Sequence, residues 1–171
     1  MYELASEDLL GGSGGKRLRA MREQDRARAL GLAVSYLMTR TAFAKLPFGH
    51  WSRILTGQIN RGHYLFAVRG NEIVGFFGWA LTTEEVADLW LSGEREPTGE
   101  ECRDGDCILI NAWEARDESV QKFVVEKFRE VVVGKRLIYG KRFYEDGRVR
   151  PVRMSVNEFV ARHVRNPTSR G

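Results

Sequence analysis

Cysteine is scarce in this chain: among 171 residues there are two, Cys102 and Cys107. Small secreted scaffolds usually carry more cysteines at framework spacings, so we expect two reduced thiols near the start of a strand. The sequence also lacks a Cys/His quartet at zinc spacing and an HExxH motif. We therefore expect neither a structural nor a catalytic metal ion.

Long apolar runs are missing as well. The longest, such as residues 73–81, fall far short of the roughly 20 residues that a membrane-spanning helix needs. Residues 1–10 are acidic and lack the basic residues that precede the apolar stretch of a secretory signal. We therefore expect a cytoplasmic protein without stable membrane insertion.

Three motifs are absent, and each absence argues against a type of activity. The sequence has no GxGxxG after a strand and no Walker A loop, which argues against dinucleotide and nucleoside-triphosphate sites. It has no Gly-x-Ser-x-Gly elbow, which argues against the nucleophile of an α/β-hydrolase. We expect no bound cofactor.

The charge balance leans to the basic side, with 27 Lys and Arg against 23 Asp and Glu and a net charge of +4. The basic residues cluster around residues 16–19, 135–136, 141–142 and 148–153. Such clusters raise association rates with an acidic protein partner. They also suit nucleic acid, or form an ordinary solvated face. We expect an acidic protein partner and no nucleic acid.

The length and an ordinary composition, 43% hydrophobic and 29% charged, indicate one globular domain. Residues 1–25 are interpreted as a flexible arm because residues 11–15 are a Gly/Ser linker. The folded domain is expected over residues 26–164. Residues 165–171 are expected to be a disordered tail.

Apolar spacing predicts the elements of that domain. Helices are expected over residues 27–44, 51–59, 83–92, 117–133 and 155–163. Strands are expected over residues 63–68, 73–81, 107–113, 136–144 and 149–154. This order predicts an α/β (α+β) fold in which helices flank a mixed central sheet.

Two histidines are candidates for acid–base chemistry. His50 follows Gly49 at the junction between a loop and a helix, where reactive side chains are often placed. It could instead cap that helix or pack beside Trp51. His63 begins a strand, and alternation directs it away from the face on which Tyr64 lies.

The end of the apolar strand over residues 107–113 forms a second candidate site. Asn111, Trp113 and Glu114 lie there, and ligands of open α/β sheets bind outside the carboxyl ends of strands. Asn111 can donate or accept a hydrogen bond, and Glu114 can act as a base. A polar strand end followed by a helix cap at Asp117 is the alternative interpretation.

A succession of motifs over roughly residues 28–145 resembles the RTX-toxin-activating lysine acyltransferases. The matching segments are Leu30-Gly31-Leu32-Ala33-Val34-Ser35-Tyr36-Leu37, Leu46-Pro47, Gln58-Ile59-Asn60, His63-Tyr64-Leu65-Phe66, Ile73-Val74-Gly75-Phe76-Phe77-Gly78-Trp79-Ala80, Asp104-Gly105-Asp106 and Ile108-Leu109-Ile110-Asn111-Ala112-Trp113. The resemblance implies a GNAT-like fold. It also implies transfer of a fatty acyl group from acyl-carrier protein to lysine side chains of an RTX-type protein, and a homodimer.

The resemblance also bears on the acyl donor. GNAT enzymes that use acyl-CoA carry a Gly-rich diphosphate loop after the buried strand, but residues 114–119 are Glu-Ala-Arg-Asp-Glu-Ser. This acidic, glycine-free segment would repel a diphosphate, which favours a donor delivered by acyl-carrier protein as co-substrate.

The family's catalytic histidine and aspartate fall here on Phe43 or Ala44 and on Asn111. Two hypotheses follow. In the first, His50 and Asn111 are catalytic, and Trp113, Arg142 and His63 bind substrate. In the second, the chain is a catalytically silent relative that binds acyl-carrier protein or a peptide.

Overall fold

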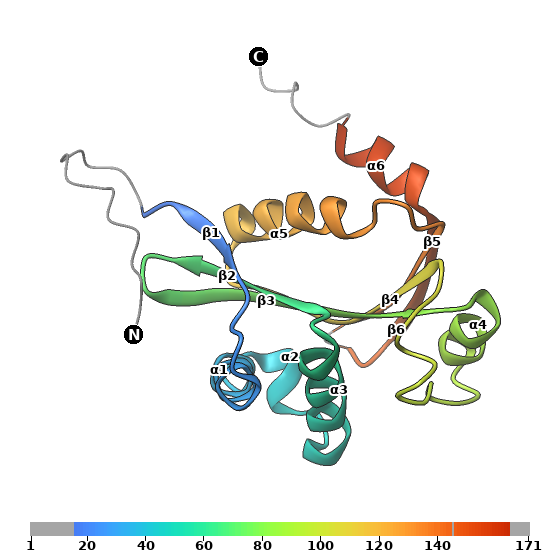
Figure 1. Cartoon of the computed structure of the whole chain (residues 1–171), viewed down its shortest axis with the longest axis horizontal. Coiled ribbons are helices and arrows are strands. Elements are labelled where there is room, and N and C mark those ends of the chain that lie inside the picture. Colours follow the sequence, from blue (N-terminus) through green and yellow to red (C-terminus); the bar gives the residue numbers. More distant parts are fainter. Residues whose placement is uncertain (1–15, 145, 165–171) are drawn as a thin grey trace.

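A central sheet of six strands organises the computed structural model, which describes residues 16–144 and 146–164, the last two as backbone alone. The strands lie side by side in chain order, β1-β2-β3-β4-β5-β6 (Figure 1). Their bounds are Leu18–Met21, Tyr64–Arg69, Glu72–Thr82, Cys107–Ala115, Leu137–Phe143 and Val149–Ser155. Neighbours are antiparallel except for β4 and β5, which are parallel.

Six helices cover the two faces of the sheet in the described part of the chain. Their bounds are α1 Arg26–Leu37, α2 Thr41–Ala44, α3 Phe48–Arg61, α4 Glu84–Ser92, α5 Glu118–Val131 and α6 Val156–Val164. In Figure 1, α5 and α6 lie on one face, and α1 to α4 lie on the other. No helix in the described ranges is both long enough and apolar enough to cross a bilayer.

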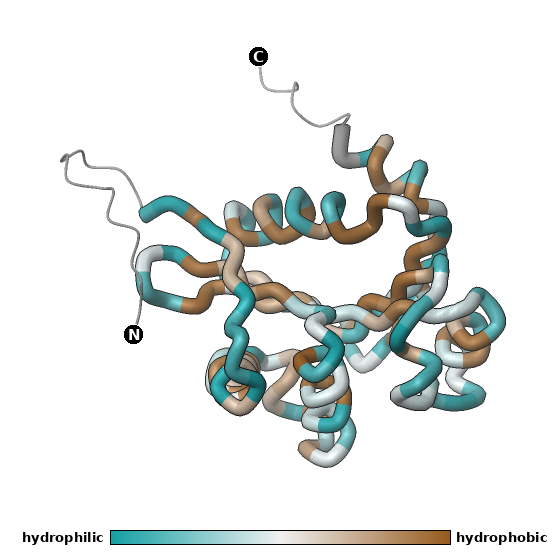
Figure 2. Tube along the Cα trace, viewed as in Figure 1, coloured by the Kyte–Doolittle hydropathy of each residue, from teal (hydrophilic) through white to brown (hydrophobic). Residues whose placement is uncertain are grey.

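The parallel pair exists because α5 joins β4 to β5 as a crossover, which a tight hairpin cannot do. Helix α5 has one apolar stripe, with Val120, Val124 and Phe128 fully buried against the sheet. Figure 2 shows this side of α5 in brown and the opposite side in teal. The predicted helix over residues 117–133 is therefore confirmed, with Asp117 as its N-cap.

Two core layers form on opposite sides of β3 because its side chains alternate between faces. Phe76 packs with α1 and α3, whereas Phe77 packs with α5. A third cluster lies under α4 and contains both cysteines. These thiols are free, as predicted, and both are buried. Burial is the main reason that the pKa of Cys107 is raised to about 12.

Two predicted elements are corrected. Residues 18–21, assigned to a flexible arm, form strand β1 on the edge of the sheet, paired with residues 66–69 of β2. The helix expected over residues 27–44 is two helices, because Thr39 and Arg40 interrupt it between α1 and α2. Residues 1–15 and 165–171, predicted to be an arm and a tail, lie outside the described residues.

Candidate functional site

The sheet opens where β4 and β5 part. Their parallel register runs from Cys107 opposite Leu137 to Ile110 opposite Gly140. Beyond that point β4 continues to Ala115 alongside β3, while β5 continues to Phe143 alongside β6. The backbone groups of residues 111–115 that faced β5 thereby lose that strand as a partner. An opening at the carboxyl ends of parallel strands is where ligands of α/β sheets bind.

A β-bulge lies at the first residue of this opening. Gly78 pairs with Ala112 and Trp79 pairs with Ile110, so Asn111 is the extra residue of β4. Bulges redirect a side chain and occur often beside active sites. The predicted candidate Asn111 is thus placed at the point where the strands separate.

Gln58 of α3 holds Asn111 in place. Its Nε2 donates a hydrogen bond to Asn111 Oδ1, and its side chain is fully buried. The approach depends on Gly78, because a Cβ atom there would overlap the Gln58 amide. Asn111 Nδ2 remains a donor for a ligand. Gln58 was not predicted, although it shares a helical face with the buried Trp51, Leu55 and Ile59.

The structure does not bring His50 to Asn111. His50 lies in the first turn of α3, eight residues before Gln58, or about 12 Å along the helix axis. Its side chain is half-buried beside Trp51, which packs edge-on against Phe48. The catalytic role of His50 stays a prediction.

His63 lies at the start of β2, on the face opposite the buried Tyr64, as alternation predicted. Its ring stacks on Trp79 with centroids 5.8 Å apart. Nδ1 is buried and has no hydrogen-bond partner among the described residues. Burial and then the nearby Arg61, Arg22 and Lys135 lower the pKa of His63 to about 4. The imidazole is therefore neutral at pH 7.

Trp113 and Glu114 point to opposite sides of β4. The Trp113 ring packs against Phe77 and Phe128 on the α5 side, and its Nε1 donates to Gln121 Oε1 over 2.9 Å. Glu114 binds Arg40 Nε over 3.0 Å. Trp113 thus forms a wall beside the opening, whereas Glu114 is held in an ion pair with Arg40.

Arg142 lies on the other side of the opening, in the exposed half of β5. Its register partner across the hairpin is Arg150, which is also exposed. Like charges directly opposite each other destabilise a hairpin, and an anionic partner bound between the two arginines would relieve their repulsion. Phe143, opposite Val149, adds an apolar side chain that is 66% exposed.

The amino terminus of α5, which follows β4 in the chain, is already occupied by the carboxylate of Asp117. Asp117 accepts a hydrogen bond from Val120 N and a bidentate pair from Arg69, at 2.9 and 3.2 Å. These bonds hold the pKa of Asp117 well below its usual range. A diphosphate at this helix end would meet a carboxylate instead of free backbone N–H groups.

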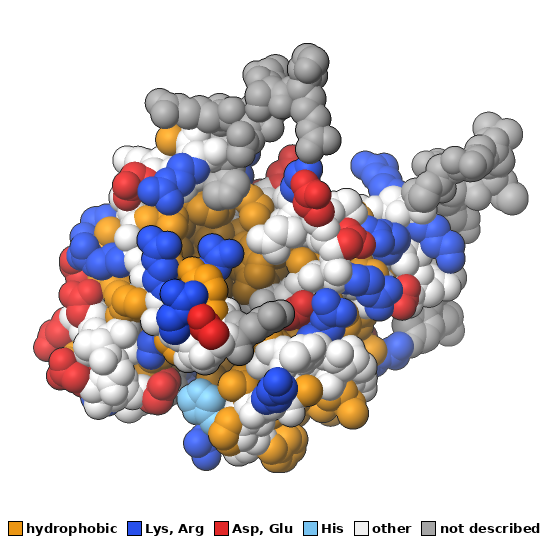
Figure 3. Space-filling view, turned by 180° about the vertical axis from the view of Figure 1, so that it is seen from behind, with side chains coloured by type: hydrophobic (Ala, Val, Ile, Leu, Met, Phe, Trp, Pro, Cys, Tyr) orange, Lys and Arg blue, Asp and Glu red, His pale blue; other side chains and the backbone are white. Residues whose placement is uncertain are grey.

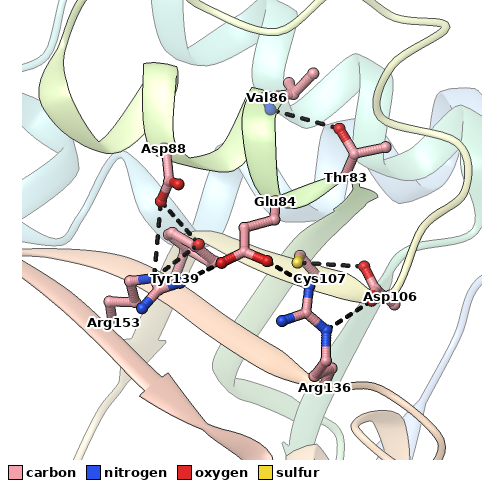
Figure 4. Close-up of polar contacts among 9 residues, drawn as sticks. All are labelled: Thr83, Glu84, Val86, Asp88, Asp106, Cys107, Arg136, Tyr139 and Arg153. Carbon is pink, nitrogen blue, oxygen red and sulfur yellow. Dashed lines mark hydrogen bonds and ion pairs between the residues drawn. The ribbon is translucent and has the colours of Figure 1, made fainter.

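A polar network that was not predicted ties α4 to β5 and β6 (Figure 4). Tyr139 donates to Asp88 over 2.8 Å and accepts from Arg153 Nε over 2.9 Å. Glu84 accepts from Arg153 and from Arg136, and Arg136 also binds Asp106 over 2.8 Å. The network holds α4 against β5 and β6 at the end of the sheet where β4 and β5 are still paired.

Among the described residues, no three carboxylate, histidine or cysteine side chains lie close enough together to bind a metal ion.

One face of the molecule is hollowed (Figure 3). The hollow shows apolar side chains, and Lys and Arg side chains lie around it. An apolar hollow with a cationic border suits a ligand that combines an apolar part with an anionic part.

No model of a known protein family and no curated protein matches the chain. Similar solved structures include the GphF GNAT-like decarboxylase in complex with isobutyryl-CoA, at 16% identity and TM-score 0.50, covering 75% of this chain and 67% of that one. The loading GNATL domain of CurA from Lyngbya majuscula has 9% identity and TM-score 0.49, with 76% and 67% covered. An agmatine N-acetyltransferase mutant in its apo form has 11% identity and TM-score 0.46, with 86% and 80% covered. The mixed six-stranded sheet flanked by helices therefore has the GNAT-like fold.

Proposed function

We propose that this protein is an acyltransferase that takes a fatty acyl group from acyl-carrier protein and transfers it to lysine side chains of an RTX-type protein. The observation that carries the choice of donor is the α5 amino terminus, where Asp117 and Arg69 occupy the place of a diphosphate. A carrier protein needs no such diphosphate site. The lysine acceptor rests on the sequence resemblance.

The opening between β4 and β5 would receive the thioester arm of the carrier protein. Backbone groups of residues 111–115 that no longer face β5 can pair with the amides of that arm. The exposed Arg142 and Arg150 lie on the hairpin that borders the opening. They would attract the acidic carrier protein.

The chemistry is a nucleophilic substitution at the thioester carbonyl. The lysine nitrogen attacks the carbonyl carbon, the C–N bond forms, and the C–S bond breaks to release the thiolate of the carrier. Because Asn111 Oδ1 is taken by Gln58, Nδ2 would donate to the developing oxyanion. His50 lies about 12 Å along α3 from Gln58, so it would accept the proton of the lysine ammonium, and return one to the thiolate, through intervening water molecules.

The test is intact-mass analysis of an RTX-type protein fragment incubated with this protein and either acylated carrier protein or the same acyl group on CoA. We expect acylation with the carrier protein and at most trace acylation with CoA. Equal rates with both donors would overturn the proposed donor. Absence of acylation with both donors would overturn the proposed transfer.

Variants separate the roles. Asn111→Leu should lower the rate roughly 10²–10³-fold by removing the oxyanion donor, and His50→Ala roughly 10²–10⁴-fold by removing the base. Thr56→Ala on the exposed side of α3 is the matched control and should leave the rate unchanged. A His50→Ala protein as fast as the parent would show that another group, or water, takes the proton.

A second candidate function is a silent module that binds acylated carrier protein. The observation that favours it is that the partner of Asn111 is the amide of Gln58 and not an imidazole. This function predicts saturable binding of acylated carrier protein, measured by calorimetry, while the thioester stays intact in the presence of the acceptor. Any measured turnover would exclude it.

A further inference from the structure

A cluster of cations surrounds an open pocket of about 530 Å³ beside the start of β2. Its lining residues come from four segments: Arg26 from α1, Asn60 and Arg61 from α3, His63 from the turn just before β2, and Arg103 from the loop before β4. Arg103 reaches this place because its residue bridges Leu81 of β3, beyond the end of β2. His63 O accepts from Trp79 N of β3, and Trp79 pairs with Ile110 of β4, so the pocket lies across β3 from the start of the opening.

The turn between α3 and β2 aims two of these side chains at the pocket. Gly62 adopts a φ of 73°, and His63 N donates to Gln58 O over 2.9 Å to close the end of the helix. Arg61 and His63 therefore flank a rigid turn. The guanidinium of Arg61 folds back over Gly57, where an added Cβ would lie 2.8 Å from its Nη1.

Two of the three arginines in the pocket form no ion pair with an acidic residue in the described part of the chain. Arg61 Nε and His63 Nδ1 are buried and unpaired among the described residues, and Arg26 and Arg61 form no ion pair with any described carboxylate. Burial lowers the pKa of Arg61, but a guanidinium stays charged at pH 7. An unpaired buried donor is costly, and an anion would satisfy it.

The nearby carboxylates already have partners. Glu23 binds Arg28 over 3.2 Å, and Asp25 caps α1 by accepting from Arg28 N over 2.8 Å. Glu100 binds Arg103 over 3.1 Å, but both side chains are largely exposed, so a more highly charged anion can displace it.

We propose that this pocket, defined by Arg26, Arg61, His63 and Arg103, binds the phosphate group of a phosphate monoester. Three guanidinium groups match a dianion better than a single carboxylate, and the planar fork of arginine binds phosphate oxygens in pairs. Neutral His63 can present a donor nitrogen to the same group. The proposal is independent of the acyl transfer proposed above and would hold for a protein without that activity.

The test is an NMR titration with inorganic phosphate and, separately, with glycerol 3-phosphate, at constant ionic strength set by chloride. We expect saturable shifts at residues 60–63 and at Arg103, and a rise in the pKa of His63 when phosphate is bound. Equal affinity for both probes would indicate recognition of the phosphate alone. Tighter binding of glycerol 3-phosphate would indicate that the organic part also contacts the pocket.

The matched variants are Arg61→Gln in the pocket and Arg53→Gln two turns earlier on the exposed side of the same helix. We expect Arg61→Gln to weaken phosphate binding at least about tenfold and Arg53→Gln to leave it unchanged. If Arg61→Gln fails to fold, Arg26→Gln and Arg103→Gln serve in its place. Absence of saturable shifts in the parent, equal binding of acetate, or equal losses in both variants would overturn the proposal.

Discussion

Gly78 is the residue that lets α3 approach β4 closely enough for Gln58 to reach Asn111. A Cβ at this position would overlap the Gln58 side chain, which is fully buried and cannot swing into solvent. We expect Gly78→Ala to lower the free energy of unfolding by about 1–3 kcal/mol, the usual cost of overpacking. Urea unfolding measures it. Gly140→Ala is the control, because nothing lies within 4 Å of its added Cβ. Equal losses in both variants would contradict this account.

His63 makes the stability of the fold depend on pH. Its pKa is lowered from 6.5 to about 4, first by burial, so the unfolded chain binds its proton more readily than the folded chain. The resulting stability is present above pH 6.5 and is lost as the pH falls toward 4. Between pH 7 and pH 5 the loss amounts to about 2 kcal/mol.

The measurement is urea unfolding of the parent and of His63→Gln across that range. We expect His63→Gln to remove most of the pH dependence, because most carboxylates titrate below pH 5. Thr56→Ala, which changes an exposed side chain of α3 that does not titrate, is the control and should keep the slope of the parent. A parent whose stability is flat from pH 7 to pH 5 would show that His63 is not buried as a neutral ring.

At the level of single residues, the sequence pattern predicted the place of a residue in its strand or helix better than it predicted the partners of its side chain. Alternation placed Tyr64 in the core and His63 on the other face. Asn111 was predicted near the end of its strand but lies in the middle of β4, at a bulge. The partner of Asn111 was beyond such reasoning, because it depends on a bulge and on a glycine in a third element. The signal that was present is Gln58 itself, a polar residue on the apolar stripe of α3.

Among the elements, β1 was missed because a run of four residues, Leu-Arg-Ala-Met, is too short to give a strand pattern. An edge strand needs only one neighbour, and a charged residue such as Arg19 on it discourages pairing with other chains. The long first helix was divided because Thr39 and Arg40 end α1, where Thr39 Oγ1 donates to Tyr36 O over 2.7 Å. Such local competition for backbone groups leaves little trace in apolar spacing.

The amino terminus of α5 depends on Asp117 for both its cap and its ion pair. We expect Asp117→Ala to lower the thermal midpoint by about 2–4 °C, because Val120 N loses its acceptor and Arg69 loses its partner. Asp117→Asn keeps the cap and should lose less. Thermal unfolding followed by circular dichroism ranks the two. A larger loss for Asn than for Ala would contradict the capping role.

For the whole molecule, the expectation of a GNAT-like mixed sheet is confirmed, because the order of helices and strands leaves few ways to bury every apolar face. The homodimer stays a prediction, as does the choice of acyl-carrier protein as partner. Both predictions concern contacts made by the surface of the protein, and the spacing of apolar residues in the sequence reports on the core instead. Arg142 and Arg150 are separated in the sequence by a turn, and the structure shows that they lie opposite each other beside the opening.

This pairing gives a prediction for the association of the whole protein with acylated carrier protein. Reversing both charges, with Arg142→Glu and Arg150→Glu, should slow association about 10–100-fold at low salt by removing attraction to an acidic partner. Stopped-flow fluorescence at several salt concentrations measures it, and the parent should lose its advantage as salt rises. The matched control reverses Arg17 and Arg19, which change the net charge equally at the β1 edge, the opposite edge of the sheet. If both double variants slow association equally, net charge and not the β5–β6 hairpin guides the carrier protein. If neither double variant slows association, the carrier protein does not dock beside the opening.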